Sequence, residues 1–129
     1  MAQIKIYGRR TAIEPIKQKL SVTIHSCVVE ALKLPPDKRF HRFILLEDRD
    51  FIYPGDRSEL YIILEISMFE GRSPKVKKKL IKLLFDRVYG DTGIVPNDLE
   101  IIIYEIPKAN WGIRGKPGDK LKLNYKVEV

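Results

Sequence analysis

The stretch LYIILEISMF, residues 60–69, decides the fold of this chain. It interleaves one apolar set with a second one: Leu60, Ile62, Leu64, Ile66 and Met68, and between them Tyr61, Ile63 and Phe69. A strand that is apolar on both sides is typical of the interior of a sheet and has to be covered on both faces. The stretch is therefore predicted to be a central strand of an α/β (α+β) domain.

The sequence around this strand repeats the plan of the N-terminal half. Residues 17–20, KQKL, resemble residues 77–80, KKKL, at an offset of 60 (77 minus 17), and the same offset relates Ile6 to Ile66. Each half is expected to form a strand, a helix, a turn marked by proline and a second strand. Such β-α-β units join parallel strands, so two of them predict a four-stranded sheet with both helices on one face.

Turn and cap signals give the expected boundaries within one domain of residues 1–129. In the first half, residues 1–48, we expect a strand at 3–7, a polar turn at 8–11, a helix that starts at Pro15 and stops before Pro35, and a strand at 40–46. In the second half, residues 60–107, we expect a strand at 60–69, a helix with Ser73 as N-cap and Pro74 first, a turn at 91–97 and a strand at 99–106. Residues 47–59 are expected to link the halves, and the tail 108–129 to end in an alternating strand at 121–129.

The composition indicates one soluble domain with an anionic partner. The 129 residues are 44% hydrophobic and 32% charged, and 24 Lys and Arg against 17 Asp and Glu give a net charge of +7. This charge is compatible with a small carboxylate, a phosphate or a nucleic acid. Cys27 is the single cysteine, no apolar run reaches the ~20 residues of a membrane helix, and the N-terminus resembles no signal peptide. A cytoplasmic location without membrane contact is therefore expected.

The second face of the predicted sheet indicates an oligomer. With both helices on one side, no element is left to cover the other face of residues 60–69. We therefore expect another subunit to cover it, and the tail 108–129 to contribute to that interface.

Few residues of the chain carry recognisable chemistry. There is no CxxC, HExxH or P-loop pattern, and no third ligand type clusters with the two histidines, so neither a metal nor a cofactor is expected. His25 lies among apolar helical positions and is interpreted as a packed side chain. His41, near the start of a strand, is interpreted as a surface residue, with a role in the active site as the alternative.

Arginines before helix N-termini are better candidates for binding an anion. Arg9 and Arg10 follow the first strand, and Arg72 occupies the matching turn of the second half. Backbone N–H groups and the helix dipole favour anions at such turns, and arginine adds a planar fork for a carboxylate. Arg72, between Gly71 and an N-cap, is preferred over the other two. Trp111, outside the regular elements, is expected to be an interface anchor or a pocket wall.

Three short motifs follow one another along the chain: LPPDKRF at 34–40, FEGRS at 69–73 and NWGI at 110–113. Together with the repeat they resemble the tautomerase superfamily. They are most similar to its double-length branch that includes malonate semialdehyde decarboxylase, with segments Val-Pro-Pro-x-Asp-Arg-Phe/Tyr, Arg-x-Gly-Arg-Ser and Asp-Trp-Ser-Phe. The resemblance covers essentially the whole chain. It implies a homotrimer, an N-terminal proline as general acid or base, and arginines that hold the carboxylate of a small ligand.

The chain departs from this pattern at three positions. Ala2 stands where the family has its proline, Lys38 where the decarboxylase branch has a catalytic aspartate, and Phe69 where it has its first arginine. The resemblance therefore implies catalytic positions at Ala2 and Lys38, and substrate binding by Arg72, Arg39, Trp111 and Phe69, with His41 as a further candidate. Ala2 offers a primary amine with a pKa of roughly 8, and only after Met1 has been removed.

Three functions are compatible with the sequence. The first is a tautomerase-like isomerase that acts on or binds small keto or enol carboxylates, with weak or altered activity because the proline is absent. The second is a non-catalytic oligomeric binding protein for small anions. The third is an RNA-binding module, because the RNA-recognition fold also has the strand–helix–strand plan twice. That fold needs exposed aromatic residues on its central strands, whereas residues 60–69 are almost wholly aliphatic, so RNA binding is ranked last.

Overall fold

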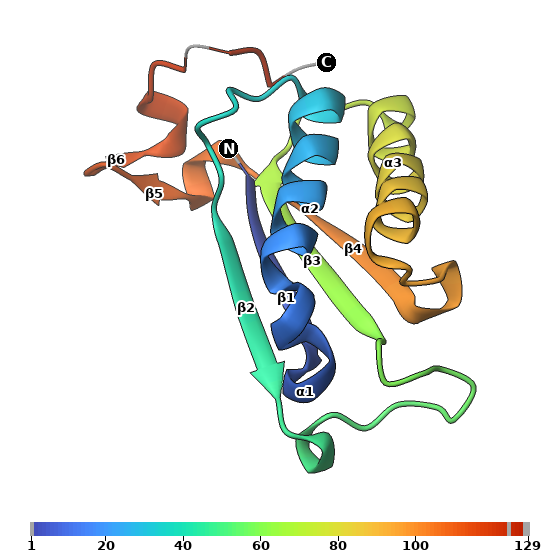
Figure 1. Cartoon of the computed structure of the whole chain (residues 1–129). Coiled ribbons are helices and arrows are strands. Elements are labelled where there is room, and N and C mark those ends of the chain that lie inside the picture. The colour runs from blue at the N-terminus through green and yellow to red at the C-terminus, as the bar shows by residue number, and fades with distance from the viewer. Residues whose placement is uncertain (1, 124, 128–129) are drawn as a thin grey trace.

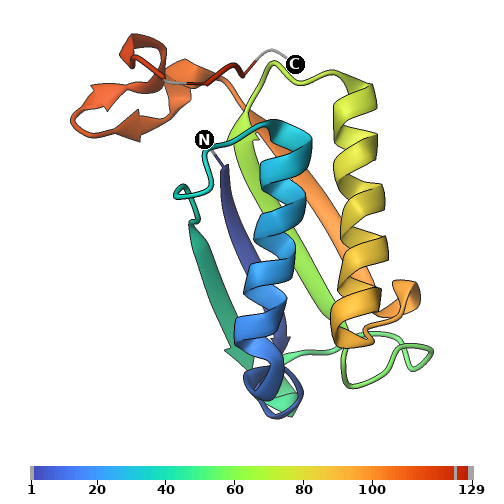
Figure 2. The ribbon, with the colours of Figure 1, turned by 45° about the horizontal axis from the view of Figure 1, so that its top comes forward.

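The computed structural model describes residues 2–123 and 125–127. Its body is a four-stranded sheet in the order β2-β1-β3-β4, with two long helices side by side on one face (Figures 1 and 2). The strands are β1, Ala2–Arg9; β2, His41–Leu46; β3, Ile62–Phe69; and β4, Leu99–Ile106. The long helices are α2, Lys17–Leu32, and α3, Pro74–Thr92. The predicted α+β architecture with both helices on one face is confirmed.

The two β-α-β units meet along their strands β1 and β3 in the middle of the sheet. β1 is parallel to β2 and β3 is parallel to β4, whereas the central pair β1–β3 is antiparallel. Ala2 lies opposite Met68, and Ile4 lies between Ile66 and His41. The starts of β1 and β2 and the ends of β3 and β4 therefore point toward one end of the sheet, called the Ala2 end below (Figure 1).

The first helix begins sooner than the sequence predicted. The expected polar turn at 8–11 is wrong, because α1, Arg10–Ile13, follows β1 directly and a 3₁₀ turn, Glu14–Ile16, leads into α2. A Cβ at Gly8 would come within 2.6 Å of Ile13 Cγ1. The absence of a side chain at Gly8 therefore lets α1 pack directly against the end of the strand.

Helix α3 begins where the cap signals predicted. The Ser73 hydroxyl oxygen accepts a hydrogen bond from the backbone N–H of Val76, and Pro74 is the first helical residue. The helix continues to Thr92, beyond the predicted start of the turn at 91, and ends at Gly93. Gly93 has a φ of 78°, the left-handed conformation that terminates helices at glycine.

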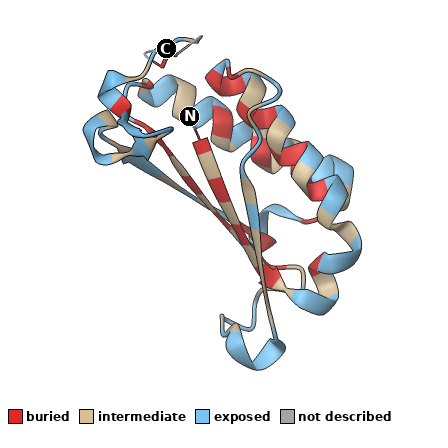
Figure 3. Ribbon diagram, turned by 90° about the vertical axis from the view of Figure 1, so that its left-hand side faces the viewer, coloured by how far each residue is buried: buried red, intermediate tan, exposed pale blue. Residues whose placement is uncertain are grey.

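The core lies between the sheet and the helices (Figure 3). Alternate residues of the two central strands point into it and are buried: Ala2, Ile4, Ile6, Ile62, Leu64, Ile66 and Met68. The other face of β3 carries Glu65 and Ser67 in its middle. Glu65 accepts hydrogen bonds from the hydroxyls of Tyr7 at 2.7 Å and Tyr104 at 3.3 Å. The prediction of an apolar second face is therefore wrong in the middle of the strand.

Residues 108–123 and 125–127 form an annex at the Ala2 end of the sheet (Figure 2). It contains a 3₁₀ turn, Lys108–Asn110, a ribbon of β5, Gly112–Ile113, and β6, Lys116–Pro117, and a second 3₁₀ turn, Gly118–Lys120. The predicted strand at 121–129 is wrong for 121–123 and 125–127, and residues 124, 128 and 129 lie outside the described residues. Leu123, Tyr125 and Val127, the alternate residues of this stretch, instead pack in one cluster with Phe69.

The segment between the halves is tied to the start of β4. The buried Asp98 carboxylate accepts hydrogen bonds from the Ser58 backbone N–H at 2.8 Å and from the Ser58 hydroxyl at 2.5 Å.

No helix in the described part of the chain is both long and apolar enough to cross a membrane.

Candidate functional site

The start of β1 is the position to which the resemblance assigns a general acid or base. Ala2 is 5% exposed and belongs to the core cluster, opposite Met68 of β3. The loop before β2 runs beside it, because the backbone N–H of Ile4 donates a hydrogen bond to the Phe40 carbonyl at 3.0 Å. Apolar surroundings favour the neutral form of an amine and so lower its pKa. This end of β1 therefore suits an amine that has to work as a base near neutral pH.

Phe69, Arg72 and Trp111 form one group of candidate residues. Phe69 is buried and meets the Trp111 ring edge to face, with ring centroids 5.2 Å apart. Arg72 is 4% exposed, and its Nη1 donates a hydrogen bond to the Phe69 carbonyl at 3.1 Å. Burial raises the pKa of the Tyr125 hydroxyl, and the charges of Arg72 and Arg114 oppose that rise. The annex therefore packs against the turn that carries Arg72.

Gly118, which belongs to none of the three sequence motifs, makes this packing possible. Its backbone N–H donates to the Trp111 carbonyl at 2.7 Å. A Cβ at this position would lie 2.5 Å from the Lys108 carbonyl oxygen and 3.0 Å from the Phe69 ring. Only glycine therefore allows the annex to approach Phe69 so closely.

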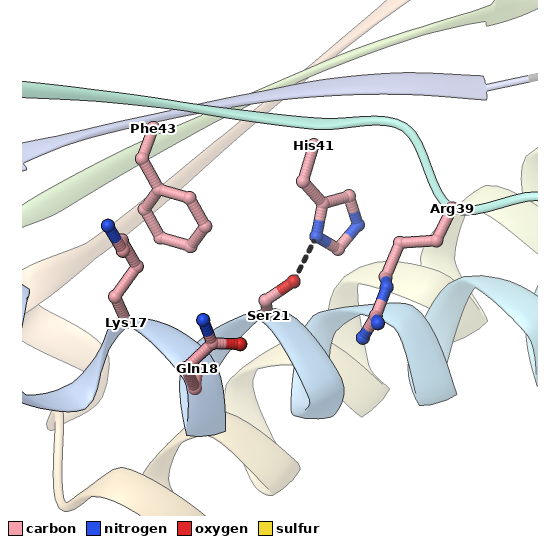
Figure 4. Close-up of a pocket in the computed structure, with 6 residues that line it drawn as sticks. All are labelled: Lys17, Gln18, Ser21, Arg39, His41 and Phe43. Carbon is pink, nitrogen blue, oxygen red and sulfur yellow. Dashed lines mark hydrogen bonds between the residues drawn. The ribbon is translucent and has the colours of Figure 1, made fainter.

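Arg39 and His41 form a second group, in a hollow of about 450 Å³ between α2 and β2 (Figure 4). The other residues that line this α2–β2 hollow are Lys17, Gln18, Ser21 and Phe43. The Ser21 hydroxyl oxygen and His41 Nδ1 form a hydrogen bond of 2.8 Å. Lys17, Gln18 and Ser21 carry no signal of a site in the sequence, because helical spacing does not show which polar residues of α2 face the edge strand.

His41 is held in its neutral form. Burial lowers its pKa to about 4, and the nearby His25 and Arg39 contribute to the same shift. The two histidine rings meet edge to face with centroids 6.1 Å apart. His25 Nε2 lies 2.6 Å from the Pro36 carbonyl oxygen, which can only accept, so Nε2 carries a proton and donates it. His25 thereby fixes the turn that leads to Lys38.

We expect His41 to make the folded chain less stable as the pH falls below about 6.5. Its pKa is about 4 in the folded chain against 6.5 for a free imidazole, so between these values the unfolded chain binds a proton that the folded chain does not. The free energy of unfolding should fall from pH 6.5 downward, by at most about 1.4 kcal/mol per pH unit. Urea unfolding at pH 7 and pH 5 measures this loss, and His41→Gln should reduce it. An equal loss in the variant would contradict the assignment.

The candidate residues thus divide between two places near the Ala2 end of the sheet. β1, which begins at Ala2, lies between β2 with its hollow and β3 with the Arg72 group. Lys38 is half-buried in the turn before Arg39, and its backbone N–H donates to the Pro35 carbonyl at 3.1 Å. Within residues 2–123 and 125–127, no group of three His, Cys, Asp or Glu side chains could hold a metal ion.

Comparison with known sequences gives a family match over most of the chain. A family profile described as tautomerase enzyme matches residues 38–114. The probable tautomerase YusQ of Bacillus subtilis is 25% identical over 116 residues, which are 86% of this chain and 91% of that protein. The 2-hydroxymuconate tautomerase of Pseudomonas putida is 35% identical over 57 residues, 44% of this chain and 90% of that shorter protein.

Solved structures share the fold over nearly the whole length. Malonate semialdehyde decarboxylase superposes with a TM-score of 0.80 at 22% identity and covers 92% of this chain and 99% of its own. A fused 4-OT solved as an asymmetric trimer gives a TM-score of 0.80 at 17% identity, over 91% and 96% of the two chains. At these identities the likeness concerns the fold.

Proposed function

This chain belongs to the tautomerase enzyme family, and from that premise we propose that it acts on or binds small keto or enol carboxylates, with weak or altered isomerase activity. The observation that carries the proposal is Ala2, at the buried start of β1 where the resemblance places a proline. Family membership supports the ligand class. 2-Hydroxymuconate and malonate semialdehyde, named in two relatives, are both small carboxylates that carry an enol or oxo group.

The proposed roles follow from charge and position. Arg72 holds the substrate carboxylate, since it lies in the turn that precedes the Ser73 cap of α3, where the helix dipole adds to its charge. Phe69 and Trp111 form the apolar wall beside it. The amine of Ala2, freed by removal of Met1, is the proposed weak base, and it can also form an imine with a carbonyl substrate. Lys38 adds positive charge where the family has a carboxylate, which disfavours protonation of a nearby amine.

A ligand screen tests this proposal. Small 2-oxo and enol acids at high concentration should raise the melting temperature, because a ligand that binds only the folded chain stabilises it. Amides of the same compounds lack the carboxylate and serve as matched controls. A co-crystal with the best acid should place its carboxylate at Arg72. Equal shifts from acids and amides, or a ligand remote from Arg72, would contradict the proposal.

We also expect an obligate homotrimer. Ile102 on the helix-free face is 40% exposed in the isolated chain, and a neighbour with the same fold is a trimer. Burial of such side chains between copies is favourable by about 25 cal/mol per Å². Analytical ultracentrifugation at micromolar concentration should show a single species of three chains. A stable folded monomer at that concentration would overturn the expectation.

Loss of catalysis would make the chain a binding protein for the same anions. The ligand screen detects binding with or without turnover, so a positive screen without turnover identifies this alternative. RNA binding is disfavoured by Glu65, which accepts hydrogen bonds from Tyr7 and Tyr104 and places a carboxylate among the aromatic residues of the helix-free face. A salt-sensitive gel shift with single-stranded RNA would reverse this ranking.

A further inference from the structure

The α2–β2 hollow has the composition of a site for a small anion, separate from the Arg72 group. Three of its six lining residues come from α2, two come from β2, and Arg39 lies in the loop that leads into β2 (Figure 4). Two of the six are cationic and none is acidic. Arg72, Phe69 and Trp111 are not among them, so a ligand here would contact a different set of side chains.

The two cations stand at opposite ends of the hollow. Lys17 lies at the end near Phe43 and Arg39 at the end near His41 (Figure 4). Lys17 Nζ is 3.3 Å from Glu14 Oε1 in a partly exposed pair at the helix start, the kind of ion pair that contributes little and yields readily to another anion. Arg39 is exposed, and its charge acts on His41. Two separated cations match a ligand with two anionic groups, or one anionic group on a longer body.

The space between the cations offers neutral polar groups and one apolar wall. Gln18 supplies an amide, and Ser21 with His41 forms a hydrogen-bonded pair. A neutral imidazole carries one N–H, so a Ser21 hydroxyl that donates to Nδ1 leaves Nε2–H to donate to a ligand, and the opposite tautomer leaves the hydroxyl hydrogen. Either arrangement presents a donor without adding charge. The Phe43 ring provides contact for an apolar body.

We propose that the α2–β2 hollow binds a small organic anion, with its carboxylate or phosphate paired to Arg39 beside His41 and its body against Phe43. The second anionic group of a dianion reaches Lys17. This site goes beyond the proposed keto–enol chemistry, because it uses neither Ala2 nor Arg72. Its ligand therefore occupies a different place from the keto or enol acid assigned to Arg72.

Titration calorimetry with the whole protein tests the site. The probes are succinate, inorganic phosphate and phenyl phosphate. Arg39→Gln should weaken binding by about tenfold or more, as expected for a hydrogen-bonded ion pair. The matched control is Arg42→Gln, which removes the same charge three residues further along, from the opposite face of the sheet in β2, where Arg42 donates a hydrogen bond to Gln3. It should change the affinity less than about twofold.

A second pair of variants tests the far end. Lys17→Gln should weaken succinate more than inorganic phosphate, and Lys19→Gln, an exposed charge on the same helix, should change neither. Tighter binding of phenyl phosphate than of inorganic phosphate would support the Phe43 wall. Preference for succinate or for the phosphates identifies the natural anionic group. The His41 imidazole nitrogen signals, followed by NMR, should move on binding in the wild type.

Three results would overturn the proposal. They are no binding of any probe tighter than about 10 mM, equal losses in Arg39→Gln and Arg42→Gln, and binding without a change at His41. Arg72→Ala should leave the affinity of the hollow unchanged. That variant therefore separates failure of this proposal from failure of the proposed keto–enol function.

Discussion

Replacing Ala2 by proline is expected to raise the ketonisation of phenylenolpyruvate by roughly ten- to a hundredfold, part of the ~10²–10⁴-fold that general acid–base catalysis contributes. The substitution converts the amine left by removal of Met1 from primary to secondary. Ala2 lies at the buried start of β1, and apolar surroundings lower the pKa of an amine toward neutrality. The gain should be partial, because Lys38 and Phe69 also depart from the family pattern.

The measurement follows the ultraviolet absorbance of the enol, with removal of Met1 checked by mass spectrometry. Ala2→Gly is the matched control, since it also permits removal of Met1 but keeps a primary amine. The positive charge of Lys38 disfavours protonation of the proline amine and so lowers its pKa. The increase in ketonisation rate should therefore persist to low pH. Wild-type turnover at ordinary enzymatic rates would contradict the idea of a lost base. An Ala2→Pro variant that is processed, trimeric and inactive would show that the pocket serves another reaction.

Arg72→Ala is expected to weaken binding of a small keto acid by roughly tenfold or more. A charge-assisted hydrogen bond to a carboxylate contributes about 1.5–3 kcal/mol, and each 1.4 kcal/mol is a factor of ten. Arg72→Lys keeps the charge but loses the planar fork, so its affinity should lie between wild type and alanine. Calorimetric titration with phenylpyruvate measures all three.

Arg72 also has a structural part that the measurement has to separate. Its Nη1 donates to the Phe69 carbonyl, and the side chain is buried beneath the annex. Thermal unfolding and oligomeric state are therefore recorded for each variant beside the affinity. Unchanged affinity in a folded Arg72→Ala chain would reject Arg72 as the carboxylate ligand.

Local signals in the sequence predicted those parts of the fold that local chemistry decides. Ser73 and Pro74 mark the start of α3, because capping involves only neighbouring residues. Strand β4 has the predicted bounds, since its apolar run ends at Pro107. The turn expected after β1 is wrong because α1 is held by packing at Gly8, where Ile13 and Ile62 of the neighbouring strand meet, and local sequence does not reveal the contribution of β3.

The candidate site was predictable only for residues that a motif carries. Arg39, Arg72 and Trp111 lie in the three quoted motifs, so the resemblance pointed to them. Ser21 belongs to no motif, and its hydrogen bond to His41 depends on how α2 crosses the edge strand. The alternation of apolar and polar residues at 121–129 predicted a strand. An extended segment whose side chains alternate between core and solvent gives this pattern whether or not another strand pairs with it.

The register of the central strands bears on the origin of the chain. Ile4 lies opposite Ile66, and Ile6 lies opposite Leu64. The offset of 60 relates Ile4 to Leu64 and Ile6 to Ile66, so it turns each of these pairs into the other. Lys5 lies opposite Glu65, and the same offset relates these two residues to each other. An approximate two-fold symmetry axis therefore passes between Lys5 and Glu65. In a dimer of identical halves, the residue at this position would lie opposite its own copy. Two lysines or two glutamates would then face each other, and like charges directly opposite destabilise a sheet. Lys5 against Glu65 instead places opposite charges across the axis, so this position favours pairing of one half with the other over pairing of either half with its own copy.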